Sequence, residues 1–208
     1  CTGFPQHLQT LIFEKICFKT MLIGLTGTPG TGKSSVSKIL ETDSGYNIIH
    51  LNELIKKENL YKEVDKNRDS VVADMDKISG RVSEIARKSR NCPVTILESH
   101  LSHYIADTVV VLRASPEELE KRLSSRDYSS EKIQENKDAE ELDIILFESV
   151  EWCVRVFEVD TTSRSLNEVA SDVNEIITAL INDDIEQITS KYKPGSVDWT
   201  SGWHSEVS

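Results

Sequence analysis

The sequence has little of what marks membrane-spanning, disulfide-stabilised or zinc-binding proteins. No apolar run approaches the roughly 18 residues that a membrane-spanning helix needs. Cysteine occurs four times, at scattered positions without a C-x-x-C pair, so we expect neither a zinc site nor a disulfide framework. Such sparse cysteine is typical of a reducing compartment, and the sequence therefore favours a cytoplasmic protein.

Positive charge is also scarce. The 208 residues include 24 Lys and Arg against 35 Asp and Glu, which gives a net charge of −11. This excess of acid disfavours general binding to a nucleic-acid backbone, and we expect no direct nucleic-acid binding and no membrane partner. An acidic surface can still bind a basic protein, and a local cationic pocket can still bind phosphates. The length fits one α/β domain.

One glycine-rich stretch organises the chain. Residues 27–34 read G-T-P-G-T-G-K-S, a complete G-x-x-x-x-G-K-S motif. An apolar run before it predicts a strand and the residues after it predict a helix, which is the context that a phosphate-binding loop requires. Gly30 and Gly32 allow a tight turn whose main-chain N–H groups face inward. Lys33 can reach the β- and γ-phosphates, and the hydroxyl of Ser34 can hold Mg²⁺. We therefore expect a nucleoside triphosphate on the loop, with Ser35 at its end.

The rest of the chain alternates strand patterns with helix patterns. Strands are predicted at 21–26, 46–51, 92–98, 107–113 and 153–159. Helices are predicted over 53–59 with Asn52 as the cap, from about 76 to 86, from 116 to about 126, over 131–151 and from 166 to about 180, whereas 60–70 reads as a loop. This order predicts the three-layer, doubly wound, parallel five-stranded sheet of a P-loop NTPase.

Polar residues are expected to meet the loop from two other segments. Glu98 and His100 follow a predicted strand, and ligands of parallel sheets gather at the carboxyl ends of strands. Arg122 and Arg126 lie four residues apart, so both project from one helix face towards a polar loop. They suit a lid over a phosphoryl group, although ion pairs with Glu118 and Glu120 on a surface helix are the alternative.

A P-loop alone does not separate kinases, GTPases and ATPases. A GTPase should carry D-x-x-G, which occurs nowhere in this chain, and N-K-x-D, which residues 136–139 match only superficially. The sequence thus favours a phosphoryl transferase over a GTPase.

Several segments together resemble the adenylate kinase isoenzyme 6 family, from about Met21 to Asp183. They are the loop at 27–34, Asn59-Leu60-Tyr61, Glu98-Ser99-His100, Val110-Val111-Leu112-Arg113, Arg122-Leu123-Ser124-Ser125-Arg126-Asp127-Tyr128, and Glu135-Asn136 with Ala139-Glu140. The chain departs from the family at Glu98, Asp127 and Lys56, where the family usually has aspartate, glycine and arginine.

The resemblance implies a broad-specificity nucleoside monophosphate kinase, which transfers the terminal phosphate of ATP with Mg²⁺ and also hydrolyses ATP. It implies a monophosphate-binding segment at about 50–66, with Asn52 and Lys56 as contacts, and a lid at about 126–136. Lys33, Arg122 and Arg126 would stabilise the moving phosphoryl group, with Arg126 also on the nucleotide. Ser34 and, through water, Glu98 would hold Mg²⁺.

The resemblance also implies late maturation of the small ribosomal subunit through a platform ribosomal protein. An ATP-driven assembly factor with little kinase activity is therefore the alternative function. His100 either positions water for hydrolysis or only hydrogen-bonds Glu98. We expect an extension at 1–20, a kinase domain at 21–183 and a tail at 184–208, in which Trp199 and Trp203 either dock on the domain or contact a partner.

Overall fold

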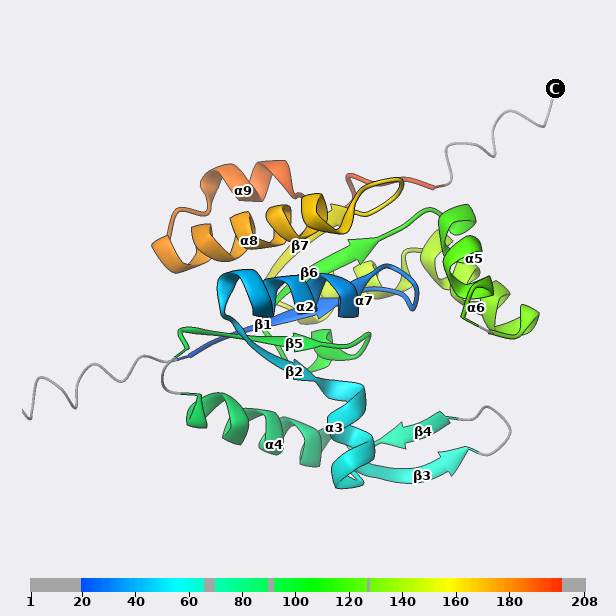
Figure 1. Cartoon of the computed structure of the whole chain (residues 1–208), viewed down its shortest axis with the longest axis horizontal. Helices are drawn as coiled ribbons and strands as arrows, with labels where there is room; N and C mark the ends of the chain where they lie inside the picture. Colours follow the sequence, from blue (N-terminus) through cyan, green and yellow to red (C-terminus); the bar gives the residue numbers. More distant parts are fainter. Residues whose placement is uncertain (1–19, 66–69, 90–91, 127, 200–208) are drawn as a thin grey trace, which may run out of the picture.

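The computed structural model describes residues 20–65, 70–89, 92–126 and 128–199. Its central sheet has five parallel strands in the order β2-β5-β1-β6-β7 (Figure 1). These strands are β1 (Met21–Thr26), β2 (Asn47–His50), β5 (Val94–Glu98), β6 (Thr108–Arg113) and β7 (Arg155–Asp160). Because β1 lies between β5 and β6, the loop after β1 emerges at the centre of the carboxyl edge. This arrangement confirms the predicted doubly wound parallel sheet.

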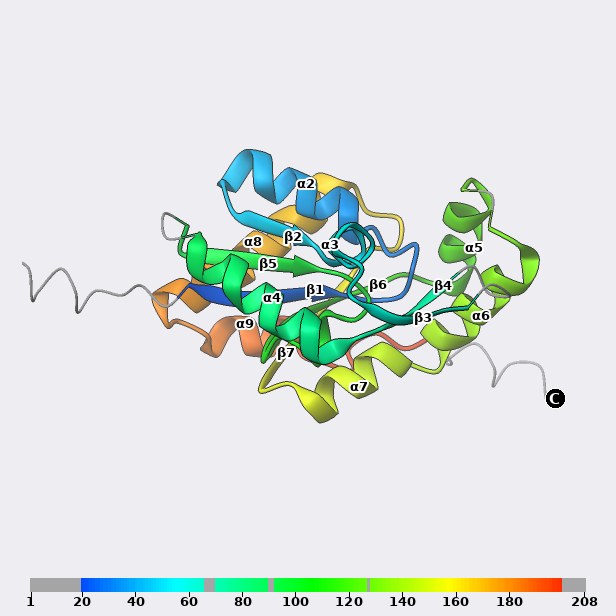
Figure 2. The same ribbon diagram turned by 90° about the horizontal axis from the view of Figure 1, so that it is seen from below.

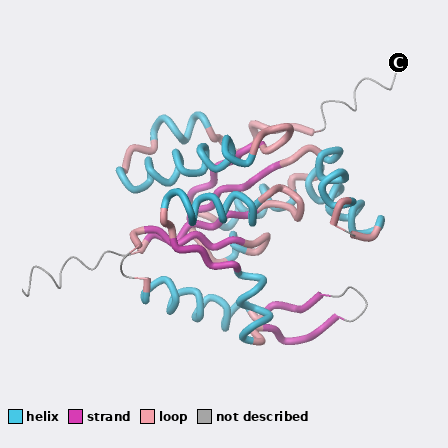
Figure 3. The backbone as a smooth tube through the Cα atoms, in the orientation of Figure 1, coloured by secondary structure: helices cyan, strands magenta, loops and turns pink. Residues whose placement is uncertain are grey.

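Helices cover both faces of the sheet (Figures 2 and 3). They are α2 (Lys33–Ser44), α3 (Leu51–Glu58), α4 (Met75–Lys88), α5 (Pro116–Ser124), α6 (Ser130–Glu141), α7 (Ile144–Trp152), α8 (Leu166–Asn182) and α9 (Glu186–Lys191), with a 3₁₀ turn η1 (Ser102–Tyr104). Within the described ranges, no helix combines the length and the apolar character that crossing a membrane requires.

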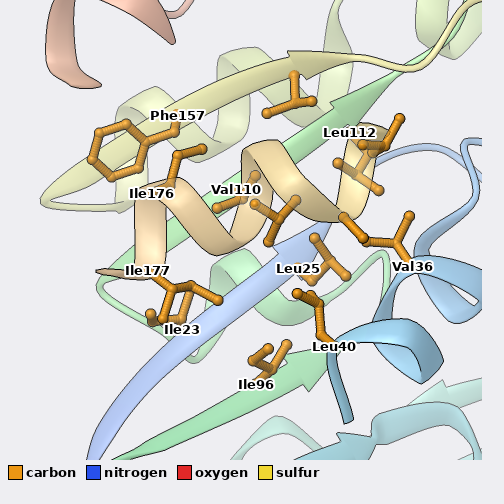
Figure 4. Close-up of a cluster of buried hydrophobic side chains, with 14 of the residues drawn as sticks. Ile23, Leu25, Val36, Leu40, Ile96, Val110, Leu112, Phe157, Ile176 and Ile177 are labelled. Atoms are coloured by element: carbon orange, nitrogen blue, oxygen red, sulfur yellow. The ribbon is translucent and has the colours of Figure 1, made fainter. Parts of the chain in front are cut away.

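The core forms because successive strand residues point to opposite faces of the sheet. On one face, Ile23, Leu25, Val110 and Leu112 pack against α2 and α8 (Figure 4). On the other face, Leu97 packs against α3 and α4, while the neighbouring Val109 and Val111 of β6 pack against α7. The central strands are therefore apolar on both faces, as parallel sheets between two helix layers require.

The segment predicted as a loop at 60–70 is instead part of an antiparallel hairpin. Strands β3 (Tyr61–Asp65) and β4 (Ser70–Ala73) pair with each other and join no other sheet among the described residues. The prediction was wrong because the charged residues Lys62 and Glu63 obscure the strand pattern. Tyr61 and Val71 nonetheless pack partly against the cluster that α3 and α4 share.

Two helix predictions also need correction. The helix predicted over 131–151 divides into α6 and α7, because Asp143 adopts a left-handed conformation with φ of 55° and hydrogen-bonds Arg113. Helix α3 begins at Leu51, so Asn52 lies inside it rather than capping it. The side chain of Asn52 instead accepts a hydrogen bond from Ser99 Oγ at 3.1 Å.

The carboxyl-terminal segment docks on the sheet. Ile188 of α9 and Tyr192 belong to the main core. Glu158 Oε2 accepts hydrogen bonds from Ser196 N at 2.7 Å, Ser196 Oγ at 2.9 Å and Val197 N at 3.2 Å. The Trp199 ring lies 5.9 Å from Arg113 Cζ, so Trp199 takes the docked alternative. Trp203 and the expected extension, apart from Thr20, lie outside the described residues.

Candidate active site

The phosphate-binding loop connects β1 to α2 at the carboxyl edge of the sheet. Gly27, Gly30 and Gly32 have φ values of 132°, 98° and 96°, which L-residues with side chains rarely adopt. A Cβ atom on Gly27 would lie 2.2 Å from Leu112 O, so this position also requires glycine for space. The motif therefore folds as a compact loop that leads directly into the helix N-terminus, where an anion is stabilised.

Lys33 is the cation inside this loop. Its side chain is buried, and Nζ donates hydrogen bonds to Gly27 O at 2.7 Å and Thr28 O at 3.0 Å. Burial lowers the pKa of Lys33 from 10.5 to about 8, against the opposing influence of Glu98 and Glu140, and Arg126 lowers it further. The free site thus holds a lysine whose charge a bound phosphate would stabilise.

Glu98 ends β5 beside the loop. Its Oε1 accepts a hydrogen bond from Ser34 Oγ at 3.1 Å, and its Oε2 lies 3.0 Å from His50 Nδ1. The hydroxyl and the carboxylate are hard oxygen donors side by side, which is the donor type that Mg²⁺ prefers. No cluster of three or more His, Cys, Asp or Glu side chains suited to a metal occurs among the described residues. A cation here would therefore need oxygen atoms from a bound phosphate as well.

His100 lies close by, two residues after Glu98, and carries no charge at neutral pH. Burial, with Lys33 and His103 nearby, lowers its pKa from 6.5 to about 4. Across the described chain, Glu98 receives hydrogen bonds from Ser34 and His50 and none from the His100 ring. The alternative in which His100 only supports Glu98 by a hydrogen bond therefore lacks its contact.

Most of the expected site residues line one cleft of about 230 Å³. The cleft residues that were predicted from the sequence are Gly30, Gly32, Lys33, Ser34, Ser35, Asn52, Glu98, His100 and Arg126. Pro29 and Tyr128 complete the lining. Segments that are far apart in the sequence thus meet at the carboxyl edge, as the strand-end argument predicts.

Arg122 and Lys56 do not line this cleft. Arg122 donates to Gly30 O at 3.3 Å, to Thr161 O at 2.9 Å and to Glu118 at 2.9 Å, so it braces the loop and also forms the ion pair expected of a surface helix. Lys56 is exposed on α3. Their roles towards a phosphoryl group remain predictions.

Sequence reasoning missed His50. It ends β2, which pairs with β5, so the strand-end argument that selected Glu98 applies to it equally. It also missed the role of Glu140, which entered only as part of the family resemblance. Glu140 is a buried residue of α6 that hydrogen-bonds Thr28 of the loop. No local pattern could have linked Thr28 with Glu140, because these two residues are 112 positions apart.

Comparison with known proteins places the chain among P-loop phosphotransferases. The model of the family described as "AAA domain" matches residues 23–143. "Putative adenylate kinase" of Methanosarcina acetivorans is 57% identical over 182 residues, which cover 86% of this chain and 97% of that protein. The protein of the same description from Methanocaldococcus jannaschii is 39% identical over 181 residues, which cover 86% of this chain and 93% of that protein. A gluconokinase structure from Sinorhizobium meliloti 1021 is 18% identical, covers 81% of this chain and 98% of its own, and has a TM-score of 0.49.

Proposed function

The chain belongs to the AAA domain family and to the group of archaeal "Putative adenylate kinase" proteins, and on this premise we propose that it is a nucleoside monophosphate kinase. It transfers the terminal phosphate of ATP, reversibly, to AMP or another nucleoside monophosphate. The observation that carries this proposal is the convergence of Lys33, Ser34, Glu98 and Arg126 on one cleft at the loop.

Lys33 and the loop bind the triphosphate. On binding, Nζ exchanges the carbonyl oxygens of Gly27 and Thr28 for phosphate oxygens, while the main-chain N–H groups of the loop and the start of α2 hold the remaining negative charge. Transfer passes through a loose transition state, so positioning and charge neutralisation supply most of the catalysis. Arg126, which lines the same cleft, neutralises the equatorial oxygens of the phosphoryl group. Arg122 holds Gly30 in place through its hydrogen bond to the Gly30 carbonyl.

Magnesium fits this site as the partner of ATP. Ser34 Oγ and the Glu98 carboxylate would hold it, Glu98 through a water molecule, and His50 would orient Glu98 from the other oxygen. When bound, the ion neutralises charge on the β- and γ-phosphates. Glutamate at position 98 keeps the carboxylate within reach of Ser34, although it is one methylene longer than the aspartate usual in the resembling family.

The acceptor monophosphate binds beside α3. Asn52 lines the cleft and is fixed by Ser99, so it can orient the acceptor. Lys56, one turn further along, offers a positive charge without the bidentate geometry of arginine. A neutral His100 accepts a hydrogen bond from water and supports slow ATP hydrolysis when no acceptor is present.

A coupled assay tests this function. Purified protein is incubated with MgATP and each nucleoside monophosphate in turn, and with MgATP alone. We expect ADP formation that depends strongly on the acceptor, and loss of at least two orders of magnitude in Lys33→Ala, with an unchanged circular dichroism spectrum. The exposed Lys38→Ala on the same helix is the matched control. ADP formation at one rate with and without every acceptor would exclude the kinase.

A second function, ATP-driven assembly of the small ribosomal subunit, is favoured by one surface. Helix α7 and its flanks expose large apolar side chains, namely Leu142 (70% exposed), Phe147 (68%), Trp152 (65%) and Val154 (75%). Exposed apolar groups gathered on one element mark a protein contact, and the exposed acid Glu151 beside them suits a basic partner such as a platform ribosomal protein.

Binding of a purified platform protein of the small subunit tests this second function. We expect nucleotide-sensitive binding that Phe147→Ser weakens and that Ile181→Ser, a change of an exposed apolar residue on α8, leaves intact. Equal binding by both variants would remove α7 from the contact. A cytoplasmic location stays a prediction from the cysteine pattern.

A further inference from the structure

A buried ion cluster lies behind the phosphate-binding loop. Arg113 of β6 is 1% exposed, and its guanidinium contacts three carboxylates. Nε donates to Glu140 Oε1 at 2.6 Å, Nη1 donates to Glu158 Oε1 at 2.7 Å, and Nη2 donates to Asp143. Buried ion pairs are weak evidence of stability, because desolvation offsets the attraction between the charges. A cluster of this kind therefore calls for another role.

The second oxygen of Glu140 connects the cluster to the loop. Glu140 Oε2 accepts a hydrogen bond from Thr28 Oγ1 at 2.5 Å, and both residues are buried. Oε1 also accepts from Ala114 N at 3.2 Å, so Arg113 and the main chain after β6 fix the carboxylate in place. Glu140 is not among the residues that line the cleft, so its contact with the loop is made from behind it.

Thr28 connects Glu140 to the catalytic lysine. Its carbonyl oxygen accepts from Lys33 Nζ at 3.0 Å and from Thr31 Oγ1 at 2.9 Å. The Thr28 side chain is therefore tied to the body of the protein while its carbonyl faces the catalytic lysine. Glu140 also lies close enough to raise the pKa of Lys33. When Lys33 turns to a phosphate, Thr28 loses one of these contacts and depends more on Glu140.

We propose that Glu140 is a positioning residue for the phosphate-binding loop, which holds Thr28 so that the loop and Lys33 are organised before ATP arrives. A preorganised loop loses less conformational entropy on binding, so its contribution appears in affinity for MgATP. The proposal rests on the proposed function only in requiring that the loop binds ATP. It does not depend on which acceptor is used.

The charge balance permits a clean test. Replacing Glu140 leaves Arg113 paired with Asp143 and Glu158, so no buried cation is stranded. Glu140→Ala removes the contact with Thr28, and Thr28→Val removes it from the other side. In Glu140→Gln, the amide oxygen can accept from Arg113 while the amide nitrogen donates to Thr28 Oγ1, so this variant restores the contact without the charge.

The experiment measures MgATP affinity by calorimetry for E140A, T28V, the double variant and E140Q. We expect about tenfold weaker binding in each single variant, no further loss in the double variant, and recovery in E140Q, because a buried charged hydrogen bond contributes on this scale. Two matched controls should bind normally. They are Thr42→Val, which removes an exposed hydrogen bond on α2, and Glu175→Ala, which removes the hydrogen bonds from Lys191 and Tyr192.

Losses of MgATP affinity that add up in the double variant would overturn the proposal. Normal affinity in both E140A and T28V would also overturn it and would leave the ion cluster with a structural role alone. If E140A does not fold, the MgATP affinity of T28V is compared with that of T42V. Normal affinity in T28V would then refute the positioning role of the contact. A wild-type protein that binds MgATP but transfers no phosphate to any acceptor would refute the proposed kinase and leave this test intact.

Discussion

Lys33 should make the nucleotide-free protein less stable at neutral pH than its fold would otherwise allow. Its pKa is about 8 in the folded protein and 10.5 in the unfolded chain, mainly because the buried ammonium is poorly solvated. The difference between these two pKa values corresponds to about 3 kcal/mol of destabilisation at a pH where Lys33 is protonated in both the folded and the unfolded state. Lys33→Met, which replaces the ammonium by an apolar group of similar length, removes this cost together with two hydrogen bonds to loop carbonyls.

The pH dependence separates these two contributions. Between pH 8 and 10.5 the unfolded chain retains the Lys33 proton and the folded protein does not, so the free energy of unfolding of the wild type rises with pH. Below pH 8 both states hold the proton and the cost is constant. The lost hydrogen bonds shift the K33M curve by a fixed amount. From pH 7.5 to pH 10 the wild type should therefore gain about 2 kcal/mol relative to K33M.

Urea denaturation in EDTA, without nucleotide, at pH 7.5, 9 and 10 measures this difference. Other titrating groups cancel in the comparison, and Lys38→Met, an exposed change on the same helix, is the control. Wild-type and K33M curves that run parallel over the whole range would show that burial does not perturb Lys33. K33M should also lose phosphoryl transfer by orders of magnitude, because Lys33 is then no longer available to the phosphates.

Three further results are expected. Binding of MgATP at pH 8 should take up about half a proton, because Lys33 is half-protonated in the free protein and the bound phosphate restores its charge. Calorimetry in buffers of different ionisation enthalpy measures the number of protons taken up, and K33M should take up none. His100→Asn should lower acceptor-free ATP hydrolysis by about a hundredfold and transfer much less, whereas equal losses would argue against water positioning. Ile176→Ala, at a fully buried position of α8, should cost about 2–5 kcal/mol of unfolding free energy in urea, and a smaller loss would mean that the core collapses around the gap.

The sequence predicts the sheet and the loop because their determinants are local. The glycines at 27, 30 and 32, the apolar run of β1 and the capping box at Ser165 and Glu168 each act within a few residues. The strand-end argument then brings Glu98 and His100 to the loop without further information. Where local pattern and tertiary contact disagree, prediction fails: α6 ends because Asp143 turns to Arg113, and Asn52 is held by Ser99 rather than by the start of its helix.

The positioning contact between Glu140 and Thr28 could not have been predicted in this way. It depends on the geometry of β6 and α6, and the three carboxylates around Arg113 lie 27, 30 and 45 positions further along the chain. The family resemblance includes Glu140, but nothing in the sequence indicates that these three acids are buried around one arginine. Only the fold makes them buried neighbours of one cation.

The docked carboxyl-terminal segment has a practical consequence for where a shortened gene can end. Glu158 Oε2 is saturated by groups of Ser196 and Val197, while its Oε1 serves Arg113. A stop codon placed after α9 would remove Ser196 and Val197. The buried Glu158 would then lose all three hydrogen-bond donors to its Oε2. Expression clones cut back to the edge of the sheet domain would therefore carry this defect, whereas clones that retain residues up to Trp199 keep the acid covered.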